Sequence, residues 1–106
     1  MSQTQMIEQQ AAPADAAEIQ KMLVLSTVHL SPTDCNKWMH SCPWTCFEKG
    51  DYGWFMYACD DEGIYMQPGV PLAVRSALTK AHQLGCDWIM FDRDGPALDD
   101  LPVYDW

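Results

Sequence analysis

Basic residues are scarce in this chain of 106 residues, which has six lysines and arginines against fifteen aspartates and glutamates. The resulting formal charge of −9 argues against direct contact with nucleic acid, because binding phosphates requires a basic face. It argues equally against an anionic membrane surface. The charge could serve only to keep the protein soluble. We expect instead that a negative surface meets a basic site on another protein.

Long apolar runs are missing as well. No stretch approaches the roughly 20 apolar residues needed to span a bilayer. Met1 is followed by polar residues rather than by the basic and apolar regions of a signal peptide. We therefore expect a cytoplasmic protein.

Paired Cys-x2-Cys knuckles, which make a zinc assignment strong, do not occur. The cysteine count of five is odd, which argues against a disulfide framework, and a reducing cytoplasm would keep these thiols reduced. Cys35, His40, Cys42 and Cys46 are zinc-ligand types within a short window, so a zinc-stabilised adaptor is one alternative. Because Cys35 and Cys42 also fit the buried side of a helix, we favour core positions and predict no cofactor.

The length allows one domain and not two. Residues 1–19 are rich in Gln and Ala and are predicted to be a flexible tail, and residues 20–106 to be a single domain. Apolar runs predict strands, and helical periodicity with flanking prolines predicts helices. The predicted strands cover 21–30, 53–59, 64–67 and 87–92, and the predicted helices cover 32–42 and 71–84.

This β-α-β-β-α-β order, with both helices on one face of a small mixed sheet, predicts an α/β fold of the α+β two-layer sandwich type. Residues 21–30 begin with a continuous apolar run and are expected to be buried on both faces. Residues 53–59 and 64–67 are expected to pair as a hairpin, because Asp60-Asp61-Glu62-Gly63 between them has the composition of a turn.

The end of the last predicted strand, Phe91-Asp92-Arg93-Asp94-Gly95, resembles the first motif of the haloacid-dehalogenase-type phosphatases. In that chemistry the first Asp attacks phosphorus, and the second protonates the leaving group with the help of magnesium. A metal-dependent phosphohydrolase using Asp92 and Asp94 is therefore an alternative. However, Pro96 stands where that family has a phosphate-binding Thr or Ser, and the residues up to Trp106 leave no room for the lysine and second acidic pair that the family's doubly wound fold supplies. We expect a binding role rather than an enzymatic one.

Acidic and aromatic side chains are the residue types expected to contact a partner. The same acids could also bind Mg²⁺ or Ca²⁺, but their spacing matches no calcium loop. Exposed aromatics beside acids are typical of protein interfaces. The predicted partner-binding residues are Asp60, Asp61, Glu62, Asp92, Asp94, Asp99 and Asp100 for charge, and Trp54, Tyr57, Tyr104 and Trp106 as anchors.

Several stretches together resemble a family of small uncharacterised bacterial proteins, a domain of unknown function carried by plasmids, prophages and integrative elements. These stretches are Leu25-Ser26-Thr27-Val28-His29-Leu30, Asp51-Tyr52-Gly53-Trp54-Phe55-Met56-Tyr57, Leu84-Gly85-Cys86-Asp87-Trp88, the segment 91–96, and 100–106. The resemblance implies no catalytic residues. It implies a context in which anti-restriction and anti-CRISPR genes gather. The leading expectation is therefore an anti-defence protein that binds a host nuclease or nucleic-acid-binding defence complex through its acidic and aromatic surface.

Overall fold

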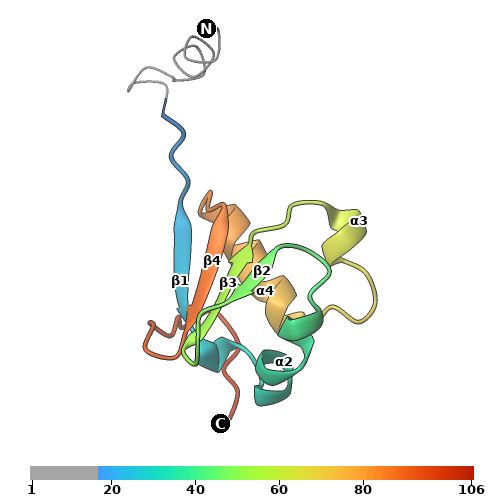
Figure 1. Cartoon of the computed structure of the whole chain (residues 1–106), viewed down its shortest axis with the longest axis vertical. Coiled ribbons are helices and arrows are strands. Elements are labelled where there is room, and N and C mark those ends of the chain that lie inside the picture. Colours follow the sequence, from blue (N-terminus) through green and yellow to red (C-terminus); the bar gives the residue numbers. More distant parts are fainter. Residues whose placement is uncertain (1–16) are drawn as a thin grey trace, which may run out of the picture.

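The computed structural model describes residues 17–106, so most of the predicted tail lies outside the described residues. Four strands form one sheet in the order β1-β4-β3-β2 (Figure 1). β1 and β4 are parallel, whereas the other two neighbouring pairs are antiparallel. The strands are β1 (Met22–Ser26), β2 (Cys46–Glu48), β3 (Gly53–Tyr57) and β4 (Trp88–Asp92).

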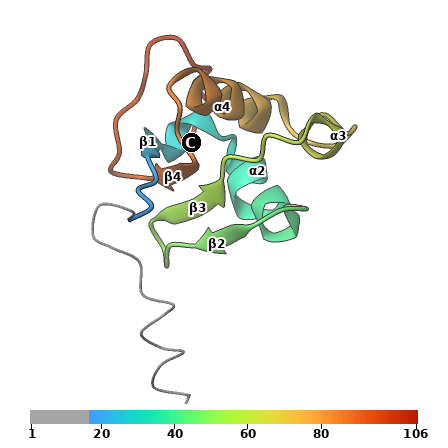
Figure 2. The same cartoon turned by 90° about the horizontal axis from the view of Figure 1, so that it is seen from above.

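The helices form a second layer. Figure 2 shows α2 and α4 on the same side of the sheet. The predicted two-layer α/β sandwich with a small mixed sheet is therefore confirmed. Within the described part of the chain, no helix has the length and apolar character needed to cross a bilayer. The helical segments are η2 (Thr27–His29), α2 (Pro32–Asn36), η3 (Trp38–Ser41), α3 (Glu62–Tyr65) and α4 (Leu72–Gln83).

The core lies between the sheet and α4. Side chains alternate between the two faces of a strand, and the register places Leu25, Phe91 and Trp54 next to one another on the covered face. Ile89 and Met56 form the neighbouring row on the same face. All five are fully or almost fully buried. The apolar stripe of α4 packs against them and consists of Ala73, Val74, Ala77, Leu78 and Ala81.

The helix α4 follows the prediction closely, because its sequence carries both its stripe and its end signals. It begins one residue after Pro71, which caps it in an extended conformation. It ends before Gly85, whose φ of 68° is the left-handed conformation that glycine adopts without strain.

The predicted hairpin is wrong in its second strand. The hairpin partner of β3 is β2, which precedes it, and the turn spans residues 49–52. The segment predicted as a strand at 64–67 instead contributes Ile64 and Tyr65 to the helix α3. The Asp61 side chain accepts a hydrogen bond from the Gly63 amide, which makes Asp61 an N-cap rather than part of a hairpin turn.

Two further boundaries differ from the prediction. β1 ends at Ser26 rather than at residue 30, because the Ser26 hydroxyl accepts the Val28 amide and starts η2. The helix predicted over residues 32–42 is interrupted at Lys37, whose φ of −124° and ψ of −62° lie outside the helical range. The chain continues as the tighter helix η3, and Cys42 ends it.

Candidate functional site

The face of the sheet that points away from the helices carries two rows of apolar side chains. The register of the four strands places these side chains opposite one another. We call this surface the open sheet face. One row consists of Met22, Trp88 and Tyr57, and the other of Val24, Met90, Phe55 and Phe47.

Much of the open sheet face is accessible to solvent. Phe47 is 59% exposed, Met22 42% and Tyr57 38%. Sheets with one face in water normally alternate apolar and polar residues, whereas strands apolar on both sides are typical of sheets buried on both sides. The sequence prediction of a two-sided buried β1 fits this composition, yet no described helix covers the face (Figure 2). The open sheet face therefore has the composition of a buried surface without a cover from residues 17–106.

The aromatic rings of this face are held in place by neighbouring groups. The Tyr57 and Trp88 rings meet edge to face with centroids 5.4 Å apart. The indole Nε1 of Trp88 donates a hydrogen bond of 2.8 Å to Oε1 of Gln20. A surface whose anchors are already ordered loses less side-chain entropy when a partner binds.

Asp92 closes one end of the open sheet face, and both of its carboxylate oxygens are engaged. Oδ2 lies 3.0 Å from Nζ of Lys49, and Oδ1 accepts a 2.8 Å hydrogen bond from the Asp94 amide. The pKa of Asp92 lies below its usual value. The main cause is the hydrogen bond from the Asp94 amide, and the next is the contact with Lys49. The guanidinium group of Arg93 stacks on the Tyr52 ring, 4.4 Å from its centroid, rather than forming an ion pair with Asp92 or Asp94.

The phosphatase-like motif is part of an anchored turn. The Pro96 carbonyl accepts a 2.8 Å hydrogen bond from the Ser26 amide, which ties the segment to β1. A Cβ on Gly95 would lie 2.8 Å from the Leu25 carbonyl oxygen, so the close approach of the two chain segments accounts for this glycine. Within residues 17–106, no group of three or more Asp, Glu, His or Cys residues is placed to hold a metal ion. The motif and its hydrogen bonds are thus accounted for by turn geometry.

The predicted acidic residues do not form one surface. Asp60, Asp61 and Glu62 follow β3, whereas Asp92 is the last residue of β4 and Asp94 lies just beyond it. Because β3 and β4 are antiparallel, the two groups lie at opposite ends of the sheet. Asp60, Glu62 and Asp94 are exposed, while Asp61 is used as a helix cap.

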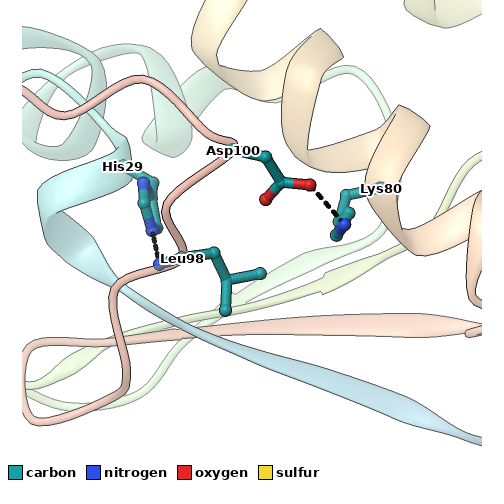
Figure 3. Close-up of polar contacts among 4 residues, drawn as sticks. All are labelled: His29, Lys80, Leu98 and Asp100. Carbon is teal, nitrogen blue, oxygen red and sulfur yellow. Dashed lines mark hydrogen bonds and ion pairs between the residues drawn. The ribbon is translucent and has the colours of Figure 1, made fainter.

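The carboxyl-terminal segment, which holds four of the predicted residues, packs on its own domain. Asp100 forms an ion pair with Lys80 of α4 (Figure 3), and this contact lowers the pKa of Asp100. Asp99 is exposed. The Tyr104 amide donates to the Val28 carbonyl at 2.9 Å. The indole of Trp106 is 62% exposed but donates to the Leu30 carbonyl at 3.1 Å. Tyr104 and Trp106 are therefore anchored to the residues that follow β1.

His29 fixes the same segment from the inside and was not singled out as a site residue by the sequence. The ring is buried, and its Nε2 accepts a hydrogen bond of 2.8 Å from the Leu98 amide (Figure 3). Because Nε2 accepts, Nδ1 carries the proton and donates to the Pro102 carbonyl at 2.8 Å. This hydrogen-bond pattern assigns the neutral tautomer and joins two points of the carboxyl-terminal segment.

Trp54 is not available as a surface anchor. It is only 6% exposed and lies on the covered face, where its Nε1 donates to the Cys35 carbonyl at 3.2 Å. The residues that take its place on the open sheet face are Phe47, Phe55 and Trp88, which sequence reasoning missed. The alternation along β3 holds the signal, since Phe55 and Tyr57 must share a face opposite to Trp54.

The predicted zinc-ligand types are not brought together as a group. Cys35 is buried, and burial raises the pKa of its thiol. His40 packs edge to face on Trp54, with ring centroids 4.8 Å apart. Cys42 and Cys46 are half-buried and pack against the core cluster.

A hollow of about 410 Å³ lies between α2 and the β2–β3 turn. Its wall combines acidic, basic and aromatic side chains, so its charge does not select one class of ligand. The lining includes His40, Glu48, Asp51, Tyr52, Arg93 and Trp106.

Comparison with known proteins gives a family and no relative of known activity. Residues 22–106 match a family model described as "Family of unknown function (DUF5983) C-terminal domain". No curated protein and no solved structure matches the chain. The match begins at the first residue of β1 and covers the whole sheet.

Proposed function

The chain belongs to this family of unknown function, the DUF5983 C-terminal domain family, and we propose that it is a protein-binding domain that docks through its open sheet face. The observation that carries the proposal is the composition of that face, which is apolar in both rows although the described chain leaves it uncovered. Contiguous exposed apolar patches on soluble domains mark interaction sites.

The charge of the chain supports a basic partner. Only two ion pairs form within residues 17–106, so most acidic side chains there remain without a basic neighbour. The net charge of −9 would steer the domain toward a lysine- and arginine-rich surface. The apolar face would then supply the buried contact, with Tyr57, Trp88 and Phe55 as the anchors that truncation affects most.

The partner class we propose is a nucleic-acid-binding protein of a host defence system. Such proteins hold phosphates with basic side chains, and an acidic domain docked there would compete with nucleic acid. The anti-CRISPR or anti-restriction character rests on the resemblance to proteins of mobile elements. Asp60, Glu62, Asp94 and Asp99 are the exposed acids that would supply attraction at the margins.

A capture experiment with one matched pair of variants tests this function. Phe55→Glu places a charge on the open sheet face. Leu72→Glu places the same charge at a residue of α4 that is 71% exposed on the helical layer. Both proteins, with the wild type, are used as bait in an extract of a defence-competent bacterium. Any captured protein is then purified and its affinity measured directly.

The expected result is a nucleic-acid-binding protein whose affinity falls at least tenfold with Phe55→Glu and is unchanged with Leu72→Glu. Its binding should weaken as salt is raised and should be displaced by duplex DNA or RNA. Equal affinity of both variants would exclude the open sheet face. Binding that does not respond to salt or to nucleic acid would exclude the basic partner class.

A further inference from the structure

Opposite charges face the hollow between α2 and the β2–β3 turn without pairing with each other. Arg93 lines the hollow from the residue after β4, whereas Glu48 and Asp51 line it from the end of β2 and from the turn. Among residues 17–106, these three side chains form no ion pair, although the hollow measures only about 410 Å³. The basic group and the acidic groups are therefore held apart across one small space.

The Tyr52 ring positions the guanidinium group of Arg93. The guanidinium stacks 4.4 Å from the ring centroid, and the Arg93 amide donates a 2.8 Å hydrogen bond to the Tyr52 carbonyl. Stacking uses the face of the guanidinium and leaves the N–H groups at its edge available. Such a planar set of donors matches the two oxygens of a carboxylate. Arg93 is thus an ordered group suited to bind a carboxylate, in a chain whose formal charge is −9.

Aromatic rings form another part of the wall. The indole of Trp106 is largely exposed, yet its Nε1 donates to the Leu30 carbonyl at 3.1 Å, which fixes the ring beside the hollow. The His40 ring lines the hollow as well and packs edge to face on the Trp54 ring, with centroids 4.8 Å apart. A planar apolar group that enters the hollow therefore meets rings whose positions are already fixed.

Neither an anion nor a cation alone matches this wall, because each would be repelled from one side. A ligand that carries both charges would be attracted from both sides. We infer that the hollow binds a small aromatic zwitterion of the α-amino acid class. Its carboxylate binds the Arg93 guanidinium, and its ring packs against Trp106. Its ammonium group faces the carboxylates of Glu48 and Asp51.

The size and the position of the hollow agree with a small ligand. Its volume of about 410 Å³ lies within the range of roughly 300–1,000 Å³ that is typical of small-molecule sites. None of the side chains of the open sheet face lines it. The ligand site does not depend on the proposed docking function, and Phe55→Glu, which tests docking, should leave the affinity for the zwitterion unchanged.

The experiment titrates the purified full chain with L-phenylalanine and follows the indole N–H resonances by two-dimensional NMR. Saturable shifts of the Trp54 and Trp106 signals are expected, with a dissociation constant of about 1 mM. Three relatives of the probe each lack one group. Phenylalaninamide lacks the carboxylate, N-acetylphenylalanine lacks the ammonium charge, and glycine lacks the ring. Each should bind about tenfold more weakly than phenylalanine.

One pair of variants assigns the carboxylate of the ligand to Arg93. Arg93→Gln should lower the affinity for phenylalanine about tenfold and remove the preference for phenylalanine over phenylalaninamide. Lys37→Gln is the matched control, because it removes the same charge from an exposed residue that does not line the hollow. It should leave both the affinity and the preference as they are in the wild type.

A second pair assigns the ammonium group. The double variant Glu48→Gln/Asp51→Asn should remove the preference for phenylalanine over N-acetylphenylalanine. Asp60→Asn/Glu62→Gln removes two exposed acids away from the hollow and should keep that preference. Shifts that do not saturate, or a relative of phenylalanine that binds as tightly as phenylalanine itself, would overturn the inference. Equal effects of a variant in the hollow and its control would also overturn it.

Discussion

The two faces of the sheet are built from similar residues but differ in how far they are buried. On the covered face Leu25 lies beside Phe91, and on the open sheet face Val24 lies beside Met90. The first pair is fully buried, while the second is only partly buried. What separates them is the helix α4, which packs on one side only. Residue type therefore identifies surfaces that need a cover, and the fold decides which of them the chain covers itself.

The difference also divides the energetics. Apolar surface removed from water by the chain itself stabilises the fold. Apolar surface left exposed contributes to association when a partner buries it. The covered face should therefore control the free energy of unfolding, and the open sheet face should control affinity.

The sharpest test of this division is the pair Phe91→Ala and Phe55→Ala. Phe91 has no exposed surface, so its truncation should lower the free energy of unfolding by about 3–5 kcal/mol. Phe55 lies on the neighbouring strand and faces the other way, so its truncation should cost about 1 kcal/mol or less. Urea denaturation followed by circular dichroism measures both. Similar losses for the two variants would show that the open sheet face is covered in solution.

One position at the start of β3 cannot accept any side chain. Gly53 has a φ of 151°, and a Cβ there would lie 1.7 Å from the Phe91 carbonyl oxygen. Gly53→Ala should therefore force β3 away from β4 and lower the unfolding free energy by about 3 kcal/mol. Gly50→Ala is the control, since Gly50 also has a positive φ but a Cβ there would meet no atom within 4 Å, and it should cost about 1 kcal/mol. Equal costs would mean that strain at φ, rather than contact across the sheet, limits both positions.

The carboxyl-terminal segment is held to the domain by the buried ring of His29. His29→Ala leaves the Leu98 amide and the Pro102 carbonyl without their partner, which should cost about 2 kcal/mol. His29→Gln retains one donor and one acceptor and should recover part of this loss. Hydrogen exchange measured by mass spectrometry should show faster exchange over residues 98–104 in His29→Ala. Unchanged exchange there would mean that the segment is held by its other contacts.

The smallest effect is expected from the ion pair at the end of the open sheet face. The pKa of Asp92 is lowered in the folded state, so its stabilising contribution is present above the ordinary aspartate pKa of about 3.9 and is lost as the pH falls through the lower folded value. Asp92→Asn should be less stable than the wild type at pH 7, and the difference should shrink on acidification. Thermal unfolding at pH 7 and at decreasing acidic pH measures the difference. A stability difference between wild type and Asp92→Asn that stays constant with pH would show that the charge of the Asp92 carboxylate is not its cause.

Much of the fold could be predicted because its signals are local. The stripe of α4 repeats with helical spacing between Pro71 and Gly85, and the apolar runs of β1 and β4 are continuous. The two-layer arrangement then follows from the order of these elements.

The remainder depends on contacts between distant residues. Phe47 belongs to a strand of three residues, which carries little periodicity of its own and becomes recognisable only by its pairing with Phe55. Tyr65 has a high strand propensity, but the Asp61 cap and the following turns place it in a helix. The open sheet face could not be defined from the sequence, because its rows require the register of four strands. Trp54 and Tyr57 were both predicted as anchors for that reason.

The parallel pairing of β1 with β4 has a consequence for how the domain is made. Among residues 17–106, β1 pairs with β4 alone, so residues 22–26 must wait for residues 88–92 before they pair. During synthesis, the β2–β3 hairpin and α4 emerge earlier and can form local contacts, whereas β1 remains an unpaired apolar strand until most of the domain has been translated. The interval between these events is when the nascent chain is most exposed to chaperones and to aggregation.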